Sequence, residues 1–182
     1  MQTLPIVYPC KTKEELQKQV LDVHQSIADF YRSLPDDIFG CRAIPDGWSV
    51  KRNMKHVIST NFIFGVWIGL PTSILKIFGK PKAKQPTIDE IVATNRLGIT
   101  NYGRYENSKS ANPEKKSLLL NKIMASAEKL NKQISKHTDE ELDNLPGLFG
   151  VGGTSLRTLI LFLLKHNIHH TNIVKIRMED SI

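Results

Sequence analysis

Residues 156–178, LRTLILFLLKHNIHHTNIVKIRM, constrain this chain most, because they combine a long apolar helix pattern with three histidines. Successive residues of an α-helix are rotated by about 100°, so His166 and His170 lie about 40° apart on one largely apolar face. His169 lies on the flank, about 60° to the other side. Two imidazoles one turn apart can hold a metal ion from one side, and a third ligand must then come from elsewhere in the chain.

A further histidine, His56, falls in a second apolar segment, residues 50–70. Ser49 can cap a helix here, because its hydroxyl can accept a hydrogen bond from an amide of the first turn. On this helix Ile63 and Trp67 lie within about 20° of His56, so the imidazole is predicted to face inward. Taken alone, an inward histidine is explained more simply as a core residue bonded to a neighbouring side chain.

Polar residues accompany His56 on the same mostly buried stripe. Asn53 and Thr60 lie one turn before and after it and are candidate catalytic residues. Together with Asn167, they are also candidates for holding a ligand's second nitrogen or a metal-bound water. His169 is a further acid/base candidate, with a position at the surface or at an interface as the alternative.

Two more long helices are predicted, over residues 12–34 and from Pro113 to about residue 135. Thr12 and Glu15 have the spacing of a capping box, and proline suits the first turn of a helix. Apolar residues recur in each at steps of three and four. These are Leu16, Val20, Val23, Ile27, Phe30 and Leu34 in one helix and Leu119, Ile123, Ala127, Leu130 and Ile134 in the other.

Four amphipathic helices predict an all-α protein, a four-helix bundle in a single domain over residues 1–182. The long connection between the second and third helices favours a crossover joining two parallel helices, which gives up-down-down-up topology. A short helix is predicted within that connection, over residues 87–102, and no segment predicts a strand. The glycines around residues 150–153 predict a tight turn that leads into a helix capped by Thr154 or Ser155.

Composition excludes several classes of function. The longest apolar run, LILFLL, is far short of a membrane span, and the N-terminus does not resemble a signal peptide. Cys10 and Cys41 are expected to be reduced thiols in a cytoplasmic protein. The formal net charge of +7 is scattered along the chain. Its densest cluster, four lysines within residues 76–84, has no interleaved aromatic residues to stack bases, so we expect no nucleic-acid partner.

The sequence Gly-Trp-Ser-Val at residues 47–50, followed by His56, resembles the opening of the second helix in the DinB superfamily. The spacing His166-x-x-x-His170 in the last helix resembles that family too, as does the Thr-Asn-Ile at residues 171–173. The resemblance covers nearly the whole chain in helix order and spacing. It implies an up-down-down-up bundle, often a homodimer, with zinc or nickel bound by the three histidines.

Characterised members of that family include thiol-dependent S-transferases, which use bacillithiol or mycothiol, and related isomerases. The resemblance therefore implies a metal-dependent enzyme that transfers a small-molecule thiol to an electrophile, or a hydrolase. The alternative is a non-catalytic bundle that binds metal or a partner. An open coordination position in a pocket beside Trp67 would favour the enzyme, and a fourth ligand from His24 or Cys41 would favour the alternative.

Overall fold

A computed structural model describes residues 3–39, 41–44, 47–85, 87, 104–106, 113–147 and 153–179. The described part is mostly helical, so the predicted all-α class is confirmed. Apart from Thr87, the short helix predicted over residues 87–102 lies outside the described residues. Among those residues, every helix is too short or too polar to traverse a lipid bilayer.

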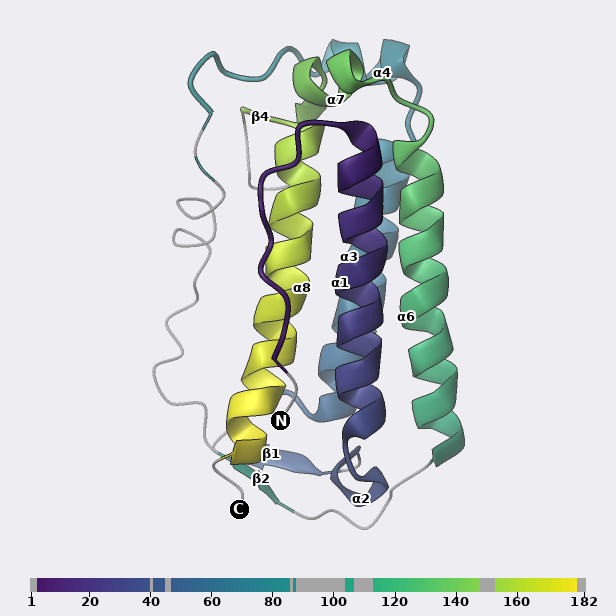
Figure 1. Cartoon of the computed structure of the whole chain (residues 1–182), viewed down its shortest axis with the longest axis vertical. Helices are drawn as coiled ribbons and strands as arrows, with labels where there is room; N and C mark the ends of the chain where they lie inside the picture. The colour runs from purple at the N-terminus through teal and green to yellow at the C-terminus, as the bar shows by residue number, and fades with distance from the viewer. Residues whose placement is uncertain are drawn as a thin grey trace.

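Four long helices lie side by side along the length of the molecule (Figure 1). They are α1 (Lys13–Ser33), α3 (Val50–Ile68), α6 (Pro113–Ile134) and α8 (Leu156–Glu179). Helices α1 and α3 each pack against both α6 and α8. Helix α3 starts at the end of the molecule where α8 finishes, which brings the first half of α3 alongside the second half of α8 (Figure 1).

The helix starts follow the predicted side-chain chemistry. Thr12 and Glu15 form the capping box of α1, and the Ser49 hydroxyl accepts a hydrogen bond from the Arg52 amide at the start of α3. At the start of α8, the hydroxyl of Ser155 accepts from the amide of Thr158 at 3.2 Å. Each cap satisfies an amide that the first turn leaves without a partner inside the helix, and so fixes where that helix begins.

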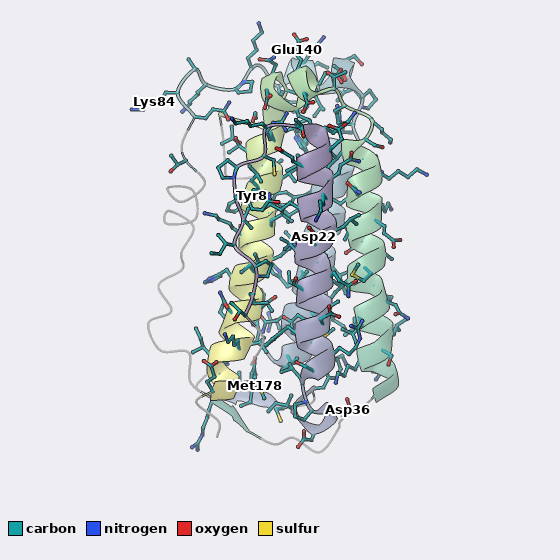
Figure 2. All side chains as sticks on the ribbon, in the orientation of Figure 1. Tyr8, Asp22, Asp36, Lys84, Glu140 and Met178 are labelled. Atoms are coloured by element: carbon teal, nitrogen blue, oxygen red, sulfur yellow. The ribbon has the colours of Figure 1, made fainter. Side chains whose placement is uncertain are left out.

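The predicted apolar stripes of α1 and α6 are buried over their whole length, and most of α8 is buried as well. Side chains from all four helices fill the space between them (Figure 2). The prediction for α3 was partly wrong, because Ile63 is 47% exposed. The buried face of α3 is centred instead on residues such as Met54, Val57 and Ile68.

The segments predicted as loops contain short elements. Three short helices lie in the described segments: α2 (Asp36–Phe39), α4 (Thr72–Ile77) and α7 (Asp139–Asn144). Two antiparallel pairs join β1 (Arg42–Ile44) to β2 (Arg104–Glu106) and β3 (Pro146–Gly147) to β4 (Thr154–Ser155). The prediction of no strand was therefore wrong, because strands of two or three residues are too short to show an alternating pattern.

Part of the predicted glycine turn before α8 is described. Gly153 has a φ of 87°, in the left-handed region that glycine adopts without a steric penalty. It directly precedes β4, which leads into α8 through the Ser155 cap. The other glycines of this turn, at positions 150 and 152, lie outside the described residues.

Candidate metal centre

Three imidazoles converge where the first half of α3 faces α8. The Nε2 atom of His166 lies 3.4 Å from Nε2 of His56 and 3.2 Å from Nε2 of His170. One ring nitrogen from each of the three lies within 4.8 Å of those of the other two. Residues separated by more than a hundred positions in the chain thus present nitrogen atoms to one point.

These distances fit a shared metal ion. Zinc–nitrogen bonds are about 2.0–2.1 Å long, so two ligands in tetrahedral geometry lie about 3.3–3.4 Å apart. The two measured separations, 3.4 and 3.2 Å, agree with this value. The outward nitrogens, Nδ1 of His166 and Nδ1 of His170, are buried and have no hydrogen-bond partner among the described residues. The Nε2 atoms of the three histidines are therefore placed as the ligands of one divalent transition metal would be.

The electrostatic environment keeps the three rings neutral. Burial lowers the pKa of His170 to about 3 and that of His166 to about 4, and repulsion from neighbouring histidines adds to both shifts. Burial, and then the positive charge of Arg52, also lowers the pKa of His56. Neutral imidazole is the form that binds a metal, so these rings are ready to act as ligands at neutral pH.

Trp48, directly before the α3 cap, forms one wall of the site. Its ring lies nearly parallel to that of His170, with centroids 5.3 Å apart, and edge-on to His56 at 4.8 Å. Its carbonyl accepts hydrogen bonds from Asn53 at 3.2 Å and from the Tyr105 hydroxyl at 3.3 Å. Sequence reasoning used Trp48 only as part of a motif, although an aromatic residue beside a helix cap could have drawn attention to it.

Trp67 is not beside the three histidines. It follows His56 by eleven positions on α3, which places it about 16 Å further along the helix. Its indole N–H donates to the Pro146 carbonyl at 3.2 Å, in the connection between α7 and α8. A pocket that joins the metal site to Trp67, the feature that would have favoured the enzyme, is therefore not seen among the described residues.

The candidate polar residues on α3 take different positions. The Asn53 amide donates to the carbonyls of Trp48 and Ser49, so it fixes the start of the helix and does not bond to an imidazole. The Thr60 hydroxyl donates to the His56 carbonyl at 2.8 Å and lies 3.5 Å from His56 Nε2. Of these two, only Thr60 lies within reach of a histidine ring at the site.

Asn167 belongs to a buried network in the core. Its amide donates to Asn61 at 2.8 Å and lies 3.2 Å from His24 Nε2. Asn61 also lies 2.8 Å from that same nitrogen, while His24 Nδ1 lies 2.7 Å from the Val20 carbonyl. His24 is completely buried, and the hydrogen bonds to both ring nitrogens identify it as a structural residue.

Within the described parts of the chain, no fourth protein ligand joins the three histidines. Among the described histidine, cysteine and acidic residues, only His56, His166 and His170 form such a group, so His24 and Cys41 stand apart. The Cys41 thiol donates to the Asp37 carbonyl at 3.4 Å. His169 is partly buried, and its ring lies edge-on to that of His170 with centroids 5.6 Å apart.

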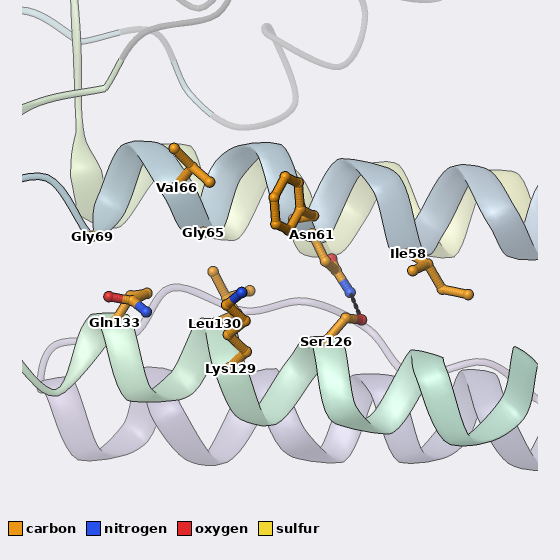
Figure 3. Close-up of a pocket in the computed structure, with 10 residues that line it drawn as sticks. Ile58, Asn61, Gly65, Val66, Gly69, Ser126, Lys129, Leu130 and Gln133 are labelled. Atoms are coloured by element: carbon orange, nitrogen blue, oxygen red, sulfur yellow. Dashed lines mark hydrogen bonds between the residues drawn. The ribbon is translucent and has the colours of Figure 1, made fainter.

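A cavity of about 270 Å³ lies between α3 and α6, away from the three histidines (Figure 3). Its lining is mostly apolar and includes Phe62, Val66 and Leu130. At one end, Asn61 donates a hydrogen bond to Ser126 at 2.9 Å, so the buried polar groups at that end are bonded to each other (Figure 3).

A second cavity, of about 720 Å³, is lined by residues of the predicted lysine cluster and of α7. Its lining includes the basic residues Lys76 and Lys80 and the acidic residues Glu140 and Glu141. Neither cavity includes any of the three histidines. Each of the three histidines is instead only partly buried in the wall of the bundle.

The family model of the DinB superfamily matches residues 19–174, a range that holds all three histidines and the Gly-Trp-Ser-Val motif. This chain belongs to the DinB superfamily. The resemblance seen in the sequence is thereby confirmed, and this superfamily is associated with metal binding. Comparison with curated proteins and with solved structures gave no significant match.

Proposed function

We propose that this DinB-superfamily protein is an enzyme that holds a divalent transition metal, zinc or nickel, with His56, His166 and His170. One observation carries this proposal: His166 Nε2 lies 3.4 Å from His56 Nε2 and 3.2 Å from His170 Nε2, and one ring nitrogen from each of the three lies within 4.8 Å of the others. The reaction we propose is S-transfer from a small-molecule thiol of the bacillithiol or mycothiol type to an electrophile, with hydrolysis as the other possibility for the same site.

His24 shows how this protein accommodates a structural histidine, and the contrast supports metal binding. Both ring nitrogens of His24 have hydrogen-bond partners. At the three-histidine cluster, by contrast, Nε2 of His166 faces the Nε2 atoms of His56 and His170, and three neutral imidazoles cannot all satisfy one another by hydrogen bonds at that point. Buried polar groups left unbonded are costly. A core role would therefore explain His24 but not the cluster.

Three protein nitrogens leave at least one coordination position open, as in catalytic metal sites. When bound, a divalent ion would supply Lewis acidity and favour the ionised form of a thiol or of water. The protein would contribute neutral imidazoles, the Trp48 ring as a wall and the Thr60 hydroxyl near His56. His169, beside His170, would be placed to accept or donate a proton.

We further propose the up-down-down-up bundle of the family. The helix directions in Figure 1 support it, since α3 and α6 run one way and α1 and α8 the other. A homodimer and a single domain over residues 1–182 are also part of this proposal, on the basis of the family resemblance. Sedimentation of the purified protein would test the dimer.

The rival function is a bundle that binds metal without catalysis. The observation that favours it is that neither of the two described cavities is lined by any of the three histidines. Turnover of an electrophile by metal-loaded protein, with none by protein treated with EDTA, would decide for the enzyme.

Elemental analysis of tag-free protein tests the metal site directly. Wild type should contain about one transition metal per chain after reconstitution with zinc or nickel. His56→Ala and His170→Ala should lose it, whereas His169→Ala, which changes a neighbouring histidine outside the cluster, should keep it. Absence of metal from reconstituted wild type would overturn the proposal, as would equal loss in all three variants.

A further inference from the structure

Arg52 lies one turn before His56 on α3 and reaches the site through Trp48. Its guanidinium carbon is 4.8 Å from the centre of the Trp48 ring, within the range of a cation–π interaction. The same ring contacts His56 at 4.8 Å and His170 at 5.3 Å between centroids. A positive charge is thus held one aromatic ring away from the histidine cluster.

Among the described residues, this charge has no carboxylate partner. Two other arginines of the described part pair with carboxylates, Arg32 with Asp29 and Arg157 with Asp139 at 2.7 Å. Arg52 is exposed, and no described carboxylate forms an ion pair or hydrogen bond with it. Its guanidinium can therefore accept an anion from solution.

The surroundings on α3 increase the positive potential. The whole helix, VKRNMKHVISTNFIFGVWI, contains no acidic residue, and Lys51 and Lys55 flank Arg52 in its first two turns. Helices α1 and α7 carry acidic residues in the first turn, where they complement the helix dipole. Helix α3 has no acidic residue in its first turn. An anion from solution would therefore be attracted both by the helix dipole and by the positive charges of Lys51, Arg52 and Lys55.

We propose that Arg52 binds a carboxylate of the thiol substrate while the three histidines hold the metal that receives its sulfur. The proposal rests on the proposed function and adds a substrate class, a thiol that carries a carboxylate. An arginine can bind a carboxylate through two parallel hydrogen bonds, which a neutral thiol cannot form. Arg52 would then be a specificity residue, while the histidines hold the reacting group.

Isothermal titration calorimetry of zinc-loaded protein tests this with two small thiols. Mercaptosuccinate carries carboxylates and 1-thioglycerol is neutral. Wild type should bind mercaptosuccinate at least about tenfold more tightly, the ratio expected for one charge-assisted hydrogen-bonded contact. Arg52→Gln should remove this preference and Arg52→Lys should keep part of it. Lys55→Gln, which removes a neighbouring exposed charge, should leave the preference intact.

A second titration separates this proposal from the metal site. Succinate is added to protein treated with EDTA, and tryptophan emission, to which both Trp48 and Trp67 contribute, is followed in wild type and in Arg52→Gln. Saturable binding that depends on Arg52 would support the carboxylate site even if the protein holds no metal. Equal affinity of wild type for both thiols, or equal losses in Arg52→Gln and Lys55→Gln, would overturn it. The proposal would also be overturned if the protein took up no zinc and succinate failed to bind to it.

Discussion

The two α8 histidines of the cluster should make the metal-free protein less stable as the pH falls from 7 to 5. Burial lowers the pKa of His170 to about 3 and that of His166 to about 4, from 6.5. In the unfolded chain both rings take up protons near pH 6.5, whereas in the folded protein they stay neutral. The unfolded state then binds more protons, so the stabilisation is present above about pH 6.5 and is lost as the pH falls toward the folded pKa values.

The size of the effect follows from these shifts. At 1.36 kcal/mol per pKa unit, each ring lowers the free energy of unfolding by about 2 kcal/mol between pH 7 and pH 5. Partial exposure of both rings makes about 4 kcal/mol an upper bound for the pair. The pKa of His24 is also lowered by burial and acts in the same direction. Asp139 and Glu141, with pKa values lowered from 3.8 and 4.5, titrate below this pH window.

Urea unfolding of EDTA-treated protein at pH 7, 6 and 5, followed by circular dichroism, measures this loss. With a slope of about 2 kcal/mol per molar urea, 4 kcal/mol moves the midpoint by about 2 M. The double variant His166→Gln/His170→Gln should lose much less stability over the same range. Trp48→Phe keeps both histidines and should behave as wild type does. If wild type and the double variant lose equal stability between pH 7 and pH 5, the assigned pKa shifts are refuted.

Single contacts give the remaining predictions. Nickel should quench the emission of Trp48, and Trp48→Phe should lose most of this quenching in a fluorimetric titration while keeping the metal stoichiometry. In urea unfolding, His24→Leu should cost about 2–4 kcal/mol, because it removes buried hydrogen bonds and leaves their partners unpaired. In thermal unfolding, Gly65→Ala should raise the midpoint, since nothing lies within 4 Å of the added Cβ. Gly47→Ala should lower it, since its Cβ would lie 2.2 Å from Arg177 Nη2.

Much of the fold could be predicted from sequence because its signals are local. The caps at Thr12 and Ser49 and the apolar steps along α1 and α6 act within a few residues, and the structure keeps all of them. The pairing of β1 with β2 could not be predicted. It places Ala43 opposite Tyr105 across a long separation in the chain, in strands of three residues.

Only part of the candidate site could be predicted from the sequence in the same way. Helical spacing places His166 and His170 on one face, but it does not say where the buried face of α3 is centred. His56 lies toward the edge of that face, so its ring is only partly buried. Ile63, which lies on the same side of the helix as His56, is exposed. Asn167, one residue after His166, is rotated by about 100° into the core, where it bonds to Asn61.

The Gly-Trp-Ser-Val motif can be understood from the contacts of its four residues. Gly47 leaves room for the guanidinium of Arg177 from the end of α8, and the Trp48 ring stacks on His170. Ser49 caps α3, and Val50 is buried at 1% exposure in its first turn. Because the cap fixes where α3 begins, it also fixes the rotation at which the helix presents its histidine. The motif thus joins the start of α3 to the end of α8 on either side of the metal ligands, so its sequence constrains the site without supplying a ligand.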